Sequence, residues 1–152
     1  MNAAPPPPTA ATAQRSLSDH VAAKGAELHA KYGPQIGWQQ LQQVMLDRSQ
    51  VRYPCEIAFT AEGLREGEFA YPHPLGDTPE DGFIIRVHPL YMTELGLVPQ
   101  LVLYQLVAVN YGEFASTDDA EAFAAAALGM EPEAYYDSLC RLADQLGGCG
   151  CG

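Results

Sequence analysis

The stretch "VPQLVLYQLVAVNYG", residues 98–112, decides how the rest of the chain must be arranged. Its side chains are apolar almost all round, and a helix of that kind is stable only when neighbouring elements cover it. Pro99 suits the first turn of such a helix, where a backbone N–H has no partner within the helix. We therefore predict a buried helix over 98–112, covered by elements on either side of it in the sequence.

Three short segments before this helix have the composition of β-strands. They are rich in β-branched and aromatic residues, and glycine, proline and aspartate separate them. The segments are "VRYPCEIAFTA" (51–61), "GEFAYPHP" (67–74) and "GFIIRVHP" (82–89). Pro54 has no N–H to give to a strand ladder, so it must lie at a sheet edge or a strand start. These segments predict a small three-stranded sheet, with residues 75–82 as a connecting loop.

Helical patterns occur on both sides of the strands. Serine, proline and glycine mark their ends, as expected for helix caps. The predicted helices cover 16–33, 37–49, 117–129 and 131–148, with a short helical turn over 89–96. Helices packed on a small sheet make an α+β domain. A second copy of the chain could cover the apolar helix as well as the sheet could, so a homodimer stays open.

The two ends of the chain differ in composition from its middle. Residues 1–14 are mainly alanine, proline and threonine, and such a segment cannot bury a core face. We expect a disordered leader there. A single α+β domain is predicted over 15–147, followed by a flexible tail of glycine and cysteine over 148–152.

The charge of the chain excludes several classes of partner. Its 152 residues include 8 basic and 19 acidic side chains, a formal net charge of −11. Such a surface repels phosphate backbones and anionic lipids, so we expect neither nucleic-acid nor membrane binding. No apolar run approaches the roughly 20 residues that span a bilayer, and the N-terminus lacks the features of a secretory signal. We expect a cytoplasmic protein with a protein partner, and the acidic surface would suit a basic one.

The buried helix and the segment after it resemble part of a known enzyme fold. The run "DAEAFAA" (119–125) is similar to the E-A-x-x-F-A-A run of repressor-cleaving and stress-response peptidases, and "NYG" (110–112) resembles the end of their zinc helix. Over 82–130 the order of elements is similar to that of minimal zincin-type metallopeptidases. In that family H-E-x-x-H places two histidines on one zinc, and the glutamate handles the proton of the bound water. The resemblance implies a zincin-like fold with Asp119 at the position of a third ligand.

The diagnostic residues of that family are all replaced in this chain. Tyr104 stands at the first histidine position, Gln105 at the glutamate and Ala108 at the second histidine. Neutral tyrosine is a poor zinc ligand, alanine is none, and glutamine cannot act as a base. The resemblance therefore implies a degenerate, non-catalytic zincin-like protein that acts as a binding or interaction module, rather than a zinc peptidase.

Polar residues on the same two helices could form a pocket at the degenerate site. Tyr104, Gln105, Asn110 and Asp119 are the candidates, with Ala108 between them. Buried polar groups need partners, so such a cluster is either a satisfied hydrogen-bond network or a ligand site. The network is the favoured interpretation.

The final residues, "CGCG" (149–152), suggest an alternative function. Cys149 and Cys151 have a spacing at which two thiolates can chelate one soft metal ion, and glycine lets the backbone fold around it. The four residues resemble the terminus of A-type iron–sulfur carriers, which implies metal or iron–sulfur handling, or dithiol–disulfide cycling. Incidental thiols on a flexible tail are the other interpretation. Cys55 and Cys140 are expected to be buried apolar residues.

Two histidines at strand ends are a further candidate site. His73 and His88 each precede a proline. They could meet in space and bind a metal with a carboxylate, or form an enzyme site together with Tyr104, although solvated loop histidines are commoner. The sequence contains no Ser-His-Asp arrangement, no phosphate-binding glycine loop and no dinucleotide fingerprint.

Overall fold

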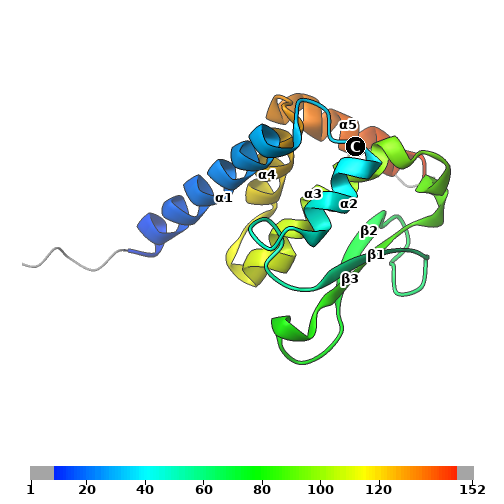
Figure 1. The fold of residues 1–152 in the computed structure, drawn as a ribbon, viewed down its shortest axis with the longest axis horizontal. Coiled ribbons are helices and arrows are strands. Elements are labelled where there is room, and N and C mark those ends of the chain that lie inside the picture. The colour runs from blue at the N-terminus through cyan, green and yellow to red at the C-terminus, as the bar shows by residue number, and fades with distance from the viewer. Residues whose placement is uncertain (1–8, 147–152) are drawn as a thin grey trace, which may run out of the picture.

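The computed structural model describes residues 9–146, and over this range the chain folds as an α+β domain (Figure 1). This confirms the predicted fold class. Five α-helices and a three-stranded sheet occupy the described residues. In chain order they are α1 (Ala10–Tyr32), α2 (Trp38–Leu46), β1 (Cys55–Phe59), β2 (Ala70–Pro74), β3 (Phe83–Val87), α3 (Val98–Tyr111), α4 (Thr117–Leu128) and α5 (Pro132–Asp144).

Helix α1 begins earlier than the sequence suggested. Thr9 caps it, because its side-chain oxygen accepts a hydrogen bond from the backbone N–H of Thr12. Residues 10–14, which we expected in a disordered leader, therefore form the first turns of the helix. Alanine has the highest helix propensity of all residues, and the proline run ends at Pro8. Residues 1–8 lie outside the described part of the chain.

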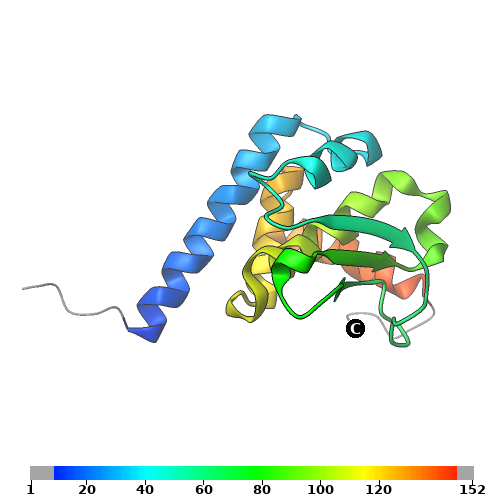
Figure 2. The ribbon, with the colours of Figure 1, turned by 60° about the horizontal axis from the view of Figure 1, so that its bottom comes forward.

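The sheet has the strand order β1–β3–β2, so that the last strand in sequence lies in the centre. β3 runs parallel to β1, with Cys55 opposite Phe83, and antiparallel to β2, with Ala70 opposite Val87. Pro54 directly precedes β1, at the strand start predicted for it. Figure 2 shows the sheet with helices α3 and α5 on the same side of it.

Helix α3 forms the centre of the core, as its apolar sequence predicted. It packs on β2 and β3 with one face and on α4 with another. Five of its side chains are completely buried, namely Val98, Leu101, Val102, Leu103 and Leu106. The helices and the sheet of a single chain therefore cover it.

The same region satisfies the minimum requirements for a membrane-spanning helix. Leu95–Phe114 is 20 residues long and apolar enough to cross a bilayer, so our expectation that no run approaches that length was wrong. In the structure two 3₁₀ segments flank α3 within this stretch, and 56% of its most apolar window is buried inside the protein. A core helix passes the same test of length and composition.

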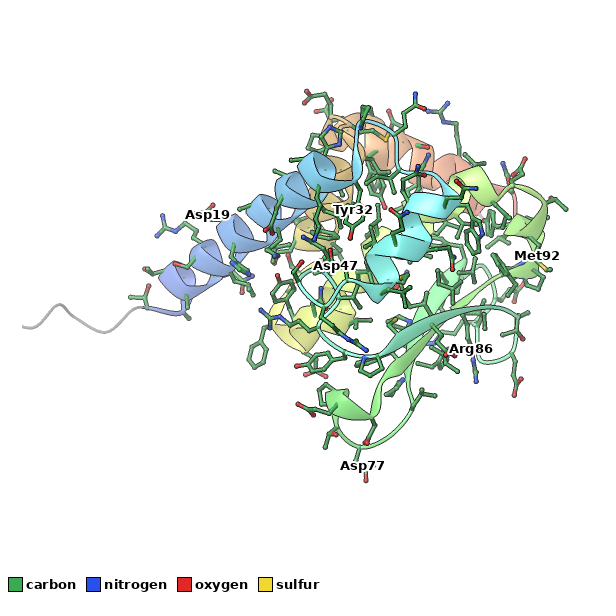
Figure 3. The ribbon with its side chains drawn as sticks, in the orientation of Figure 1. Asp19, Tyr32, Asp47, Asp77, Arg86 and Met92 are labelled. Carbon is green, nitrogen blue, oxygen red and sulfur yellow. The ribbon has the colours of Figure 1, made fainter. Side chains whose placement is uncertain are left out.

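Asp47 joins the end of α1 to the segment that leads into β1. Its carboxylate accepts hydrogen bonds from Lys31 Nζ at 2.6 Å, from the Tyr32 hydroxyl at 2.5 Å and from the Ser49 backbone N–H at 2.9 Å. Figure 3 shows the Tyr32 and Asp47 side chains facing each other. The bonds from Lys31, Tyr32 and Ser49 hold the pKa of Asp47 well below its usual range.

We predict that Asp47→Asn lowers the free energy of unfolding at pH 7 by about 2 kcal/mol, because hydrogen bonds to a charged group are stronger than neutral ones. A depressed pKa means that this stabilisation is complete above the unfolded-state pKa, near 4, and is lost as the pH falls through the folded-state value. Urea unfolding of both proteins between pH 7 and pH 3 measures it. A difference that does not shrink below about pH 4 would contradict the assignment.

Candidate functional site

Helix α3 lines a groove with Tyr104 and Gln105 in its lining. The groove has a volume of about 620 Å³ and is bounded by β2, α3, α4 and α5. Two of the candidate pocket residues, Tyr104 and Gln105, belong to its lining. Its lining residues are Gly67, Glu68, Phe69, Ala70, Tyr71, Tyr104, Gln105, Thr117, Glu121, Tyr136, Leu139 and Ala143.

The Gln105 side chain joins α3, beneath this groove, to β2 of the sheet. Its side chain is only 7% exposed, and Nε2 donates a hydrogen bond of 3.3 Å to the carbonyl oxygen of Ala70 in β2. Oε1 of the same amide accepts no hydrogen bond from the described residues. The Nε2 group of the amide therefore has a structural partner, while Oε1 is an acceptor in the lining of the groove.

The edge of the sheet beside the groove is closed to an added strand. On either side of β2, the Phe69 carbonyl accepts a hydrogen bond from the His88 N–H, and the Leu75 N–H donates one to the Gly82 carbonyl. The backbone groups of the odd-numbered residues of β2 therefore point to β3. The even-numbered residues point their backbone groups outward, and two of them, Pro72 and Pro74, have no N–H. Because Gln105 also occupies the Ala70 carbonyl, a ligand strand cannot form a regular ladder here.

Ala108 and Asn110 do not belong to the groove. Ala108 is exposed and lines a different hollow of about 590 Å³, together with Arg52 and Phe114 among others. The Asn110 amide accepts from the Arg52 backbone N–H at 2.9 Å and donates to the Gln50 carbonyl at 2.8 Å. Asn110 therefore holds the segment before β1 against the end of α3, and these side-chain hydrogen bonds go to residues outside the predicted cluster.

Asp119 also has a structural position. It is 4% exposed and forms a capping box with Ser116, accepting from the Ser116 N–H at 2.9 Å. Its second oxygen accepts a hydrogen bond of 2.5 Å from Ser18 of α1. Burial alone would raise the pKa of Asp119, but the hydrogen bonds from Ser18 and Ser116 outweigh it and lower the pKa. The carboxylate points to α1 and not to Tyr104.

The carboxylate of α4 that lines the groove is that of Glu121, which our sequence reasoning missed. Two helix positions separate it from Asp119, which is about 200° around the helix axis, so only one of the two can face α3. Burial and the neighbouring Asp118 raise the pKa of Glu121. Burial, Glu121 and Asp118 raise the pKa of Tyr104. Tyr71 and Tyr136, which share the lining, carry no motif that could have identified them.

The residues of the degenerate site do not fit zinc. Tyr104 is a neutral phenol near pH 7, since the pKa of an ordinary tyrosine is about 10 and burial raises that of Tyr104 further. Gln105 offers an amide, and Ala108 has no ligand atom. Within residues 9–146, no group of three or more histidine, cysteine, aspartate or glutamate side chains could hold a metal ion.

The two strand-end histidines do not meet. His73 lies opposite Ile84, whereas His88 pairs with Phe69 four positions further along the ladder. Four strand residues span about 13 Å. Our metal-site hypothesis for His73 and His88 was wrong because the C-terminal ends of two antiparallel strands lie at opposite ends of the hairpin. His88 instead accepts a hydrogen bond from the Leu90 N–H through Nδ1, at 3.1 Å.

The cysteines divide into described and undescribed positions. Cys55 is buried as predicted, and burial raises the pKa of its thiol to about 12, which makes it unreactive. Cys140 on α5 is only half-buried, in contrast to our expectation. Cys149 and Cys151 lie outside the described residues, so the metal, iron–sulfur or redox function of the tail stays a prediction.

Comparisons with known proteins add no relative from which a function could be transferred. Neither the protein-family models nor the curated proteins nor the solved structures give a significant match to this chain. The function must therefore be argued from the groove itself.

Proposed function

We propose that this chain is a non-catalytic binding module, and that the groove between β2, α3, α4 and α5 is its binding site. The observation that carries the proposal is the chemistry of the lining. Three tyrosines, a phenylalanine, two glutamates and a half-free amide surround a volume of about 620 Å³. Ligand sites of roughly 300–1,000 Å³ typically combine such an apolar or aromatic wall with a few polar groups.

The same lining argues against hydrolysis. A peptidase of the zincin kind needs a metal and a general base, and the corresponding positions hold Tyr104, Gln105 and Ala108. The Gln105 amide binds the carbonyl of Ala70 instead. A binding role requires none of the missing groups, and it explains why the walls of the groove are nevertheless aromatic and charged.

We expect no proteolysis by the purified protein. Incubation with casein and with a mixed peptide library, with added zinc and with a chelator, should give no cleavage above buffer in either case. Zinc-dependent cleavage that disappears in Gln105→Ala would overturn the non-catalytic half of the proposal, because it would show Gln105 taking part in the reaction.

Binding is tested by nuclear magnetic resonance. A library of small cationic, neutral and anionic compounds is added to ¹⁵N-labelled protein, and we expect some of them to shift the amides of 67–71, 104–105, 121 and 136 together. Tyr136→Ala should weaken these ligands about tenfold, since aromatic anchors dominate binding energy. Phe114→Ala, in the other hollow, is the matched control and should change nothing. Ligands that bind only elsewhere, or none at all, would overturn the proposal.

A further inference from the structure

We propose that the groove takes the arginine side chain of a basic segment in a partner protein, with the guanidinium over tyrosine rings and beside the carboxylates of Glu68 and Glu121. This inference rests on the proposed function and names its ligand. It is argued from the walls of the groove, from the charges around it and from the acceptor atoms in it.

The walls of the groove are aromatic on three sides. Tyr71 comes from β2, Tyr104 from α3 and Tyr136 from α5, and all three line one hollow. Phe69 packs against Tyr104 with its ring centroid at 6.5 Å and an interplanar angle of 70°, which fixes the orientation of that ring. Aromatic faces attract cations, and the planar guanidinium of arginine also stacks on them.

The charged side chains in the lining of the groove are all of one sign. Glu68 and Glu121 lie in its lining, and no lysine or arginine does. A neighbouring hollow of about 440 Å³ shares Glu121 and Tyr136 and adds Glu133 and Asp137, again without a basic residue. In a chain of net charge −11, this surface attracts a cationic segment and repels an anionic one.

Three groups in the groove offer acceptor atoms to a ligand, beside the hydroxyls of the lining, which can donate or accept. Oε1 of Gln105 accepts nothing from the described residues, and the two carboxylates only accept at neutral pH. Arginine brings five N–H donors in a planar fork, which matches this set. Burial and Asp118 raise the pKa of Glu121, and a cation beside it would offset both effects.

Elsewhere the described residues contain an arginine–tyrosine pair of the kind proposed for the groove. Arg52 lies with its guanidinium carbon 4.8 Å from the ring centroid of Tyr111, at the C-terminal end of α3. The groove has the tyrosines for such a pair and no arginine of its own. Because Pro72 and Pro74 close the edge of β2 to an added strand, a partner segment must bind through its side chains.

The test uses two peptides and the full chain. The first is acetyl-Gly-Arg-Gly-Arg-Gly-amide, and in the second citrulline, a neutral analogue of the same shape, replaces both arginines. Titration of ¹⁵N-labelled protein should give shifts at 67–71, 104–105, 121 and 136 with the arginine peptide. The citrulline peptide should bind about tenfold more weakly, because it lacks the charge.

Two variants separate a specific site from general charge attraction. Glu121→Gln should weaken the arginine peptide about fivefold, whereas Asp19→Asn, the same change on the exposed face of α1, should leave it within about twofold. Equal weakening by both variants would overturn the inference. Equal binding of the two peptides in the groove would overturn it as well, while the proposed binding function would stand. If neither peptide shifts the groove but other compounds do, the arginine assignment fails alone.

Discussion

Gly25→Val is expected to lower the free energy of unfolding by about 3 kcal/mol, a large effect for a single helical residue. Gly25 lies in the middle of α1, where that helix packs along α4 (Figure 1). On helix propensity alone the change from glycine would be favourable, since glycine is among the poorest helix formers. The expected loss therefore comes from packing.

The space beside Gly25 is already filled by the backbone of α4. A Cβ atom at this position would lie 2.6 Å from the carbonyl oxygen of Phe123 and 3.0 Å from Cβ of Ala126. A backbone oxygen cannot rotate away as a flexible side chain could, so the two helices must separate. Separation would loosen the neighbouring contacts of Val21 and Leu28, which are both completely buried.

Urea unfolding of Gly25→Val, Gly25→Ala and Ala23→Val measures this effect. Ala23 is exposed on the same helix, so its replacement by valine should cost only about 0.5 kcal/mol through helix propensity. Gly25→Ala should lie between the two, because its gain in propensity partly offsets the clash. If Gly25→Val cost no more than Ala23→Val, the close contact of α1 and α4 would be wrong.

The elements that could be predicted from the sequence are those with a clear hydrophobic pattern. The apolar run of 98–112 marked α3, and the β-branched segments ending in "FIIRV" (83–87) marked the sheet. The predicted and observed positions of these elements agree because a continuous apolar surface must be buried, which leaves little choice of secondary structure. The start of α1 was missed because "AATAQ" (10–14) has no apolar pattern, although alanine favours a helix there.

The candidate site was predictable only in part, since side-chain direction depends on packing that a motif does not contain. Of the candidate residues, Tyr104 and Gln105 line the groove, whereas Asp119 faces α1 and Glu121 lines the groove in its place. A one-dimensional resemblance to E-A-x-x-F-A-A cannot decide between two acidic residues about 200° apart on one helix. The contact of Ser18 with Asp119, which decides it, joins residues 101 positions apart.

Asp119→Ala is the second substitution with a large expected effect, a loss of about 3 kcal/mol in the free energy of unfolding. The carboxylate accepts from the Ser116 N–H at the start of α4 and from the Ser18 hydroxyl of α1. Alanine removes the side-chain half of the capping box and leaves the half-buried Ser18 hydroxyl without this acceptor, while the bond from the Asp119 backbone N–H to the Ser116 side chain can remain. Each hydrogen bond to a charged group contributes about 1.5–3 kcal/mol, so the loss of the bonds from Ser116 and Ser18 is expected to cost about 3 kcal/mol in total.

The part of the molecule that Asp119→Ala destabilises shows whether Asp119 has a structural role or belongs to a ligand site. Residues 10–16 of α1 are exposed, so Ser18 and Gln14 bound to Asp119 are the main polar ties of its first half to α4. Hydrogen exchange of Asp119→Ala should therefore show lost protection in the first half of α1, and little change in α5.

A milder substitution at the same position measures what the negative charge of Asp119 contributes. Asp119→Asn keeps one acceptor oxygen for the Ser116 N–H and gains an NH₂ group that can donate to the Ser18 hydroxyl. It should cost about 1 kcal/mol, because neutral hydrogen bonds replace bonds to a charged group. Ligand shifts in the groove should be the same in Asp119→Asn as in the unmodified chain, since this carboxylate faces α1. Loss of groove binding with unchanged protection of α1 would show that Asp119 belongs to the binding site after all, and would favour the zincin-like arrangement over the one described here.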